Sequence, residues 1–242
     1  MLNLSEYFGE GVGAWFSGAE TDFTLPQQGE IFGAGQQRTL RLLNIDPEQV
    51  ANIRQVHGGK VIAAQERFYP VAGEDLPEAD AAVTNVRGVA LMVRTADCVP
   101  VFLYDPQKQC IGLVHAGWRS SRERIVCSAV EMMCSAYGSG LNDLRAAIGP
   151  CIHACCYEVN QDRCLDFPEH VIPRSGQWFL DLPSVNQDQL ISSGVDPEKI
   201  YQVPFCTCCD EAFFSYRRQG ERAGRHAAVL KLNQGSKTDP VS

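Results

Sequence analysis

The chain has 242 residues, and 21 Lys and Arg residues against 29 Asp and Glu residues leave a formal net charge of −8 at pH 7. This acidic balance argues against a nucleic-acid-binding protein, whose binding surface is basic, and no apolar stretch approaches the roughly 20 residues that a membrane-spanning helix needs. The N-terminus has neither the basic start nor the apolar run of a signal peptide, so we expect a cytoplasmic protein without a membrane or nucleic-acid partner.

The first part of the chain is predicted to form short strands and one short helix. The N-terminal segment is rich in Gly and Phe and fits short strands joined by loops, and leucines over 37–44 follow a helical pattern. Residues 53–57 and 61–64 flank Gly58-Gly59 and resemble the two arms of a hairpin or a bulge. Apolar runs predict four further strands, at 81–84, 89–93, 99–104 and 109–114.

A longer helix is predicted in the middle of the chain. Ser120 lies three residues before Glu123, as in a capping box. Apolar residues then recur at helical spacing until Gly138 ends the run. Helices interrupted by prolines are expected over 160–200, and further strands are expected at 145–148, 213–218 and 227–230.

The predicted elements favour an α+β fold. Strands outnumber long helices and do not alternate with them regularly, which argues against a doubly wound parallel sheet. No stretch has the composition of a linker, and the length suits one large domain. We therefore expect a single domain over residues 1–242, with a frayed polar tail over about 233–242.

The turn sequence Asp105-Pro106-Gln107-Lys108 brings two candidate ligands together. If the strands fold directly about this turn, residues whose numbers sum to 213 face each other, and Cys98 lies opposite His115. Directly opposed residues have Cβ atoms ~4.5–5.5 Å apart, which suits two ligands of one metal ion. Taken alone, each residue is more typical of a buried core position, and only their juxtaposition makes a site about as well supported. His57, at the end of a predicted strand, is a candidate third ligand.

A Cys-His-His ligand set with an open fourth position suits catalytic zinc, which polarises a bound oxygen or lowers the pKa of water. Copper fits less well, because no methionine stands out as a weak axial ligand. The chain has only five histidines, too few for a complete multicopper centre. Asp97, next to Cys98, either orients a ligand, acts as a general base or simply caps a turn.

Two further features bear on binding. The predicted helix begins shortly after His115, so its N-terminus, together with Arg119 and Arg122, favours a phosphate or carboxylate near the metal, although such arginines are often only solvated.

The chain has eleven cysteines, an odd number that is typical of free thiols or metal ligands. A structural zinc site and buried or adventitious thiols are both open for two clusters: Cys151, Cys155 and Cys156, and Cys206, Cys208 and Cys209.

An ordered set of motifs closely resembles the YfiH family, variously called multicopper-polyphenol-oxidase-type laccase, peptidoglycan editing factor and purine nucleoside phosphorylase. The resemblance extends from about residue 50 to 230. The motifs are Arg54-Gln55-Val56-His57-Gly58, Ala79-Asp80-Ala81, Thr95-Ala96-Asp97-Cys98-Val99-Pro100, His115-Ala116-Gly117-Trp118-Arg119, Ile148-Gly149-Pro150-Cys151-Ile152, Cys156-Tyr157-Glu158-Val159 and Phe214-Ser215-Tyr216-Arg217-Arg218.

The resemblance implies a catalytic zinc ion bound by His57, Cys98 and His115, with copper as the other possible metal. It implies a layered α/β/β/α arrangement of mixed sheets. It also implies phosphorolysis of adenosine, inosine and methylthioadenosine, with adenosine deamination, and for bacterial members the editing of peptidoglycan precursors.

The chain departs from the family pattern near its N-terminus. The family motif Phe-Ser-Thr-Arg-x-Gly-Gly is replaced by Phe16-Ser17-Gly18-Ala19-Glu20-Thr21, which lacks the arginine and the paired glycines. If that arginine holds substrate in relatives, another arginine must compensate here. The predicted site therefore comprises catalytic Asp97, Arg119 and Arg54, with Arg217 and Ser120 binding substrate or phosphate.

We expect a zinc-dependent purine nucleoside phosphorylase with adenosine deaminase activity, whose partners are a purine nucleoside and phosphate. The alternatives are an amide hydrolase that acts on a peptidoglycan precursor and a weakly active metal-binding module. A copper-dependent phenol oxidase is the least supported, because the supply of histidines is too small. The motifs do not fix the oligomeric state.

Overall fold

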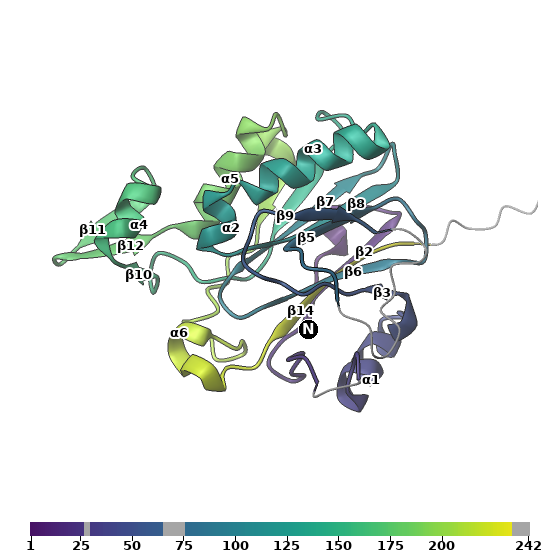
Figure 1. Ribbon diagram of the computed structural model, residues 1–242, viewed down its shortest axis with the longest axis horizontal. Coiled ribbons are helices and arrows are strands. Elements are labelled where there is room, and N and C mark those ends of the chain that lie inside the picture. Colours follow the sequence, from purple (N-terminus) through teal and green to yellow (C-terminus); the bar gives the residue numbers. More distant parts are fainter. Residues whose placement is uncertain (27–29, 65–75, 234–242) are drawn as a thin grey trace, which may run out of the picture.

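The computed structural model describes residues 1–26, 30–64 and 76–233 (Figure 1). The helices in this part of the chain are α1 (Ala34–Leu42), α2 (Trp118–Arg122), α3 (Ile125–Tyr137), α4 (Gln161–Asp166), α5 (Leu182–Ser192) and α6 (Tyr216–Gln219). Short 3-10 helices cover Ser5–Tyr7, Pro47–Gln49, Pro197–Lys199 and Gly220–Arg222. The expected frayed tail lies, apart from residue 233, outside the described residues.

Three sheets contain the strands of the described residues. A five-stranded sheet has the order β1-β2-β14-β6-β3, a six-stranded sheet has the order β13-β9-β7-β8-β5-β4, and a three-stranded antiparallel sheet has the order β10-β12-β11. The two larger sheets are mixed, with parallel pairs only at β3–β6, β9–β13 and β4–β5. The strands are β1 (Leu2–Asn3), β2 (Val12–Phe16), β3 (Val50–Ala51), β4 (Val61–Ala63), β5 (Ala81–Thr84), β6 (Ala90–Thr95), β7 (Val99–Asp105), β8 (Cys110–Ala116), β9 (Arg145–Ile148), β10 (Glu158–Val159), β11 (Val171–Arg174), β12 (Gln177–Leu180), β13 (Ile200–Gln202) and β14 (His226–Leu232).

The six-stranded sheet is buried on both faces. Successive side chains of a strand point to opposite faces, so Phe102 and Tyr104 of β7 pack toward the five-stranded sheet. Val101 and Leu103 of the same strand pack toward α3 and α5. Figure 1 shows these two helices covering the outer face of the sheet.

The five-stranded sheet alternates in the same way. Leu91 and Leu230 face the six-stranded sheet, while Met92 and Val229 pack on the other side with Leu40 of α1. The order of layers is therefore helix, sheet, sheet, helix. The expected α+β class and the layered α/β/β/α arrangement are confirmed. The expectation of a single domain over the whole chain stays a prediction.

The hairpin between β7 and β8 differs from the predicted one. Asp105 pairs with Cys110 and Pro100 pairs with His115, so residues whose numbers sum to 215, not 213, face each other. Four residues, 106–109, form the turn. Asp105 accepts hydrogen bonds from the N–H groups of two turn residues, at 2.8 and 3.0 Å, which stabilises the longer loop.

The error in register does not separate the candidate ligands. A shift of two residues keeps every side chain on its original face, whereas a shift of one would reverse it. Cys98 therefore still lies on the face of His115, as a diagonal neighbour two residues before Pro100, the residue that pairs with His115.

Several other predicted elements are wrong. Residues 61–63 do not form a hairpin with 53–57 but pair in parallel with β5, because Asp80 anchors the segment between them, as described below. Residues 213–218 form a loop and the start of α6 in place of a strand. The region 160–200 contains the hairpin β11–β12 between its two longer helices.

The helix predicted after residue 119 is two helices. Gly117 is the N-cap of α2, and Arg124, in the left-handed conformation, separates α2 from α3. Gly138 ends α3, as predicted. Ser120 lies inside α2 and is not a capping residue. Among the described residues, none of the helices combines the length and the apolar character that crossing a membrane requires.

Candidate metal centre

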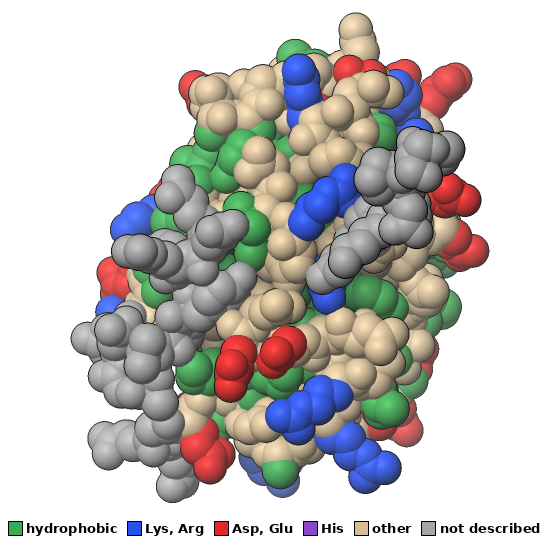
Figure 2. Space-filling view, turned by 90° about the vertical axis from the view of Figure 1, so that its right-hand side faces the viewer, with side chains coloured by type: hydrophobic (Ala, Val, Ile, Leu, Met, Phe, Trp, Pro, Cys, Tyr) green, Lys and Arg blue, Asp and Glu red, His purple; other side chains and the backbone are tan. Residues whose placement is uncertain are grey.

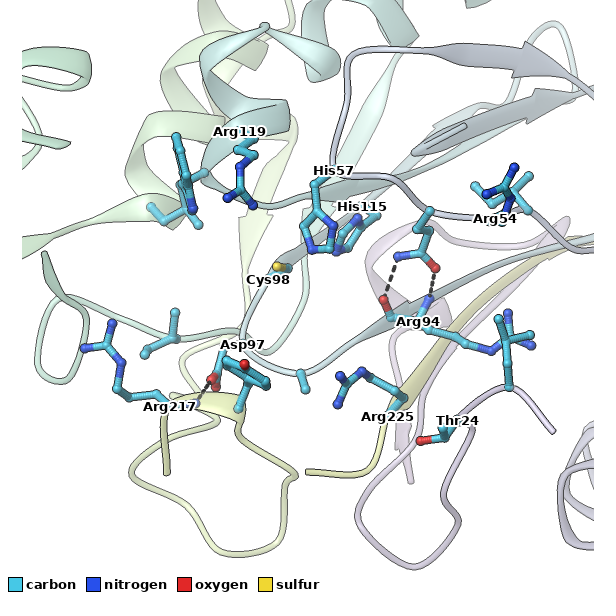
Figure 3. A pocket seen from close by; sticks show the side chains of 18 of the residues that line it. Thr24, Arg54, His57, Arg94, Asp97, Cys98, His115, Arg119, Arg217 and Arg225 are labelled. Atoms are coloured by element: carbon cyan, nitrogen blue, oxygen red, sulfur yellow. Dashed lines mark hydrogen bonds between the residues drawn. The ribbon is translucent and has the colours of Figure 1, made fainter. Parts of the chain in front are cut away.

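Three segments distant in the chain bring His57, Cys98 and His115 together. His57 follows β3, Cys98 immediately precedes β7, and His115 lies on β8. One donor atom from each residue lies within 4.8 Å of the other two. The two imidazole rings meet edge to face, with their centroids 4.8 Å apart. Figure 3 shows the three side chains close together in the lining of a cavity.

The buried carboxylate of Asp80 positions both histidines. It accepts a hydrogen bond from Nδ1 of His115 at 2.8 Å. It also accepts the backbone N–H groups of Val56, His57 and Gly58, at 3.1, 2.9 and 2.8 Å. These three bonds hold the backbone of His57 in the left-handed region, at φ 59°. Residues other than glycine rarely adopt this conformation without support. One carboxylate thus fixes the ring of His115 and the backbone that carries His57.

The hydrogen bond to Asp80 also fixes the state of the ligand. Because Nδ1 of His115 donates its proton to the carboxylate, Nε2 is left as the atom able to bind a metal. Burial lowers the pKa of His115, but Cys98 and Asp80 outweigh burial and raise it to about 9. Burial likewise raises the pKa of Cys98, but the two histidines outweigh it and lower that pKa to about 6.

This donor set fits a divalent metal ion. A thiolate beside two imidazoles supplies the negative charge and the nitrogen donors that a zinc ion prefers. Gly117 lies directly against two of the candidate ligands. A Cβ atom at this position would be only 3.1 Å from Sγ of Cys98 and 3.2 Å from a ring carbon of His57. The glycine therefore keeps the ligands free of a neighbouring side chain.

The centre opens into a cavity of about 730 Å³, a volume that suits a small-molecule ligand. Its apolar walls include Trp118, Tyr157, Tyr216, Ile152 and Leu182. The cationic residues of its lining are Arg54, Arg94, Arg119, Arg217 and Arg225. The cavity is therefore far more basic than the acidic chain as a whole.

The opposite side of the molecule has a different character. Figure 2 shows the face near α1, where positive and negative side chains are interspersed and no histidine is visible among the described residues.

The structure places the predicted arginines in different surroundings. Arg119, on α2, stacks on Trp118 at 4.6 Å and directs its guanidinium toward Cys98 (Figure 3). Arg54 lies at the rim, where it forms an ion pair with Glu78 at 2.7 Å. Among these two, Arg119 is the cation that faces the metal ligands.

Arg217 connects two loops of the cavity wall. Its guanidinium donates to the carbonyl oxygens of Cys156 at 3.2 Å and Glu158 at 2.9 Å. It also lies 5.3 Å from the ring centre of Tyr157. The side chain of Arg217 therefore lines the cavity, but the hydrogen bonds that its guanidinium makes are to backbone carbonyls of the cavity wall.

The surroundings of Asp97 and Ser120 indicate that both residues support the fold. The carboxylate of Asp97 accepts three hydrogen bonds, from Oγ1 of Thr207 at 2.7 Å, Oγ of Ser215 at 3.0 Å and the N–H of Arg217 at 2.6 Å. This geometry favours the capping interpretation over the general base, because donors occupy both oxygens. Ser120 is fully buried in α2 and does not line the cavity.

Sequence reasoning missed three residues of the site. Asp80 stands out in the sequence only as part of the motif Ala79-Asp80-Ala81. Arg94, in the otherwise apolar strand β6, donates to the carbonyl of Phe23 at 2.7 Å and to Oδ1 of Asn52 at 2.6 Å. Burial lowers its pKa to about 10, so it stays charged at neutral pH. Arg225 directs its guanidinium into the cavity opposite Arg119 (Figure 3).

Comparison with known proteins gives the family. Residues 16–233 match the family model described as multi-copper polyphenol oxidoreductase laccase. The chain belongs to this family. The resemblance to YfiH proteins that the motifs indicate is confirmed by the similarity to a solved YfiH structure, given below.

Named relatives of this laccase-type family are similar over most of their length. The chain is 33% identical to adenosine deaminase RL5 from an unknown prokaryotic organism, over 76% of this chain and 75% of that protein. It is 35% identical to purine nucleoside phosphorylase YlmD of Geobacillus stearothermophilus, over 73% of this chain and 69% of the relative.

Solved structures of the family share the fold. YfiH of Bacillus licheniformis superposes with a TM-score of 0.83 at 25% identity, over 92% of this chain and 93% of the other. YlmD of Geobacillus stearothermophilus superposes with a TM-score of 0.82 at 27% identity, over 93% of both chains.

Proposed function

We propose that this protein is a zinc-dependent purine nucleoside phosphorylase that cleaves adenosine, inosine and methylthioadenosine and also deaminates adenosine. The observation that carries the proposal is the convergence of His57, Cys98 and His115 at the end of an arginine-lined cavity. The names of the relatives at 33–35% identity support it.

The metal ligands would be His57, Cys98 and His115, which leave a coordination position toward the cavity. When bound, zinc supplies a Lewis acid that polarises an oxygen or nitrogen of the substrate. Asp80 keeps the ring of His115 in the required tautomer. The family name refers to copper, but five histidines favour one small centre over a multicopper one.

Phosphate would bind between the arginines of the cavity. Arg119 and Arg225 direct their guanidinium groups into it from opposite sides (Figure 3). Arg94 contributes a further cation, and its Nη2 atom has no hydrogen-bond partner among the described residues. Guanidinium groups bind phosphate oxygens through paired, charge-assisted hydrogen bonds. These arginines would therefore offset the phosphate charge that the acidic protein as a whole repels.

The aromatic wall suits the purine. Trp118, Tyr157 and Tyr216 line the cavity and offer flat apolar surfaces to a planar base. Burial raises the pKa of Tyr157 to about 12, so its phenol is protonated at neutral pH and would be able to donate a hydrogen bond to the base. The wall would thus bind the base, while the arginines bind the phosphate.

Both reactions exchange a group on the nucleoside. In phosphorolysis a phosphate oxygen forms a bond to C1′ of the ribose, the C1′–N9 bond breaks, and the base leaves with the electron pair and takes up a proton. In deamination a water oxygen replaces the amino group at C6, and ammonia leaves. The residues of the cavity hold the nucleoside and exclude bulk water in both cases.

The proposal is tested with purified, zinc-loaded protein and adenosine. With phosphate present, adenine and ribose 1-phosphate should form; without phosphate, inosine and ammonia should form. A Cys98→Ser variant should lose both reactions. Absence of both products from the zinc-loaded protein would contradict the proposal, and cleavage of a muropeptide amide instead would favour the amide-hydrolase alternative.

A further inference from the structure

A second group of thiols lies outside the candidate metal centre. Cys155, Cys156, Cys206 and Cys209 bring four Sγ atoms within 4.8 Å of one another. The shortest separations are 3.2 Å between Cys156 and Cys209 and 3.4 Å between Cys155 and Cys209. With zinc–sulfur bonds of about 2.3 Å, the sulfurs of a tetrahedral site are about 3.8 Å apart. The cluster therefore has the size of a tetrathiolate zinc site.

Two loops hold these thiols in register, independently of any metal. The backbone of Cys151 bridges that of Cys206, and the N–H of Thr207 donates to the carbonyl of Cys151 at 2.9 Å. Each loop then turns sharply: Cys156 N–H donates to His153 at 3.0 Å, and Cys209 N–H donates to Cys206 at 3.2 Å. Each turn thereby presents two thiols to the other loop.

The surroundings suit negative charge on the sulfurs. Four thiolates with one Zn²⁺ ion carry a net charge of −2. Three guanidinium groups bind the carbonyls of the same loops: Arg174 to Cys155 at 3.1 Å, Arg217 to Cys156 at 3.2 Å and Arg218 to Cys208 at 2.7 Å. Such cations offset the charge of a tetrathiolate site.

Hydrogen bonds within the loops also favour a thiolate at one of the four cysteines, Cys206. The N–H of His153 donates to Sγ of Cys206 at 3.4 Å. Burial raises the pKa of Cys206, but this and other backbone N–H groups outweigh burial and lower it. In contrast, burial and neighbouring thiols raise the pKa of Cys155 to about 12. Gathering all four as thiolates is therefore costly unless a cation shares the site.

We propose that Cys155, Cys156, Cys206 and Cys209 bind a structural zinc ion, separate from the candidate catalytic centre. A single disulfide would account for only two of the four thiols. The ion would tie the loop that carries Tyr157 to the loop that leads to Arg217, so it would hold two walls of the cavity in place.

Metal analysis of the full chain tests the proposal. Protein purified under reducing conditions and loaded with zinc should bind two ions per chain. Cys156→Ser and Cys209→Ser should each bind one, while Cys98→Ser should lose only the other. Cys208→Ser is the matched control, because it alters the same loop outside the four-thiol group, and it should keep both ions.

Two further measurements keep the test independent of the folding of the variants. Cobalt-substituted wild-type protein should show the intense sulfur-to-cobalt absorption of a four-thiolate site, well above that expected from Cys98 alone. Thiol titration of the denatured, metal-free protein should recover all eleven cysteines. One zinc per chain that only Cys98→Ser removes, or two missing thiols, would overturn the proposal.

Discussion

Asp80 accepts the Nδ1 proton of His115 at 2.8 Å, so a fully buried carboxylate determines which nitrogen of that ring is available to a metal. Burial raises the pKa of Asp80, but His115 and the backbone donors outweigh burial and lower it. The carboxylate is therefore anionic in the folded protein and acts as the positioning residue of the centre.

Replacing Asp80 should weaken the metal centre. In Asp80→Asn the amide no longer stabilises the donated proton of His115, and orienting carboxylates of this kind are worth about 10- to 100-fold in metal affinity. Competition with a chromophoric chelator measures the change. Asp162→Asn, on the first turn of α4, is the control and should bind zinc as the wild type does. Equal affinity in all three proteins would rule out the positioning role.

Adding a methyl group at Gly117 should also reduce zinc affinity. The new Cβ would lie 3.1 Å from Sγ of Cys98, so the ligand must move by a few tenths of an ångström. Gly33→Ala is a matched control, because Gly33 is likewise a helix N-cap in the extended conformation but has no neighbour within 4 Å of the added atom. We expect several-fold weaker binding for Gly117→Ala and no change for Gly33→Ala. The same loss in both variants would show that a helix-capping effect, not crowding, is responsible.

The two reactions should respond differently to loss of Arg119. A hydrogen bond to a charged group contributes about 1.5–3 kcal/mol, so Arg119→Met should raise the KM for phosphate by about 10- to 100-fold. Deamination uses water and should change little. Arg54→Met, which breaks the rim ion pair with Glu78, should raise the KM for phosphate much less. Steady-state kinetics with varied phosphate checks this, and an unchanged KM for Arg119→Met would place phosphate elsewhere.

Acid should destabilise the fold through His226. This fully buried imidazole accepts the N–H of Phe214 at 2.8 Å, and burial lowers its pKa below 6.5. The unfolded chain therefore binds this proton at a higher pH than the folded protein does, so the free energy of unfolding decreases as the pH falls below about 6.5.

Urea unfolding at pH 7 and pH 5 measures the effect of His226. The His226→Gln variant is less stable at pH 7 because the packing changes, but it should lose less stability between the two pH values than the wild type loses. Parallel losses would mean that His226 does not contribute to the acid sensitivity.

The sequence predicted the layers and the ligands better than the connections between them. Apolar runs located β5 to β8, because central strands buried on both faces are nearly continuous in hydrophobicity. The placement of Cys98 on the same face as His115 survived a wrong turn length because the error was an even number of residues. The residues alone offered His57 only as a candidate, and the resemblance to the family added it to the ligand set.

Long-range polar contacts escaped prediction. The role of Asp80 depends on backbone N–H groups 22 to 24 residues away in the chain, and no local pattern encodes such a contact. In the sequence Arg94 only interrupts an apolar run. In the structure it donates a hydrogen bond to the carbonyl of Phe23, 71 residues earlier in the chain. The strand predicted at 213–218 is instead a loop and the start of α6, where Asp97 accepts hydrogen bonds from Ser215 and Arg217.

The position of β14 has a consequence for how the protein is made. This strand lies between β2 and β6, and Phe16 pairs with Ala228, which is 212 residues further along the chain. During translation β2 and β6 therefore each lack one neighbouring strand until β14 has left the ribosome. Such distant pairing slows folding, and the waiting edges would be natural binding sites for chaperones in the growing cell.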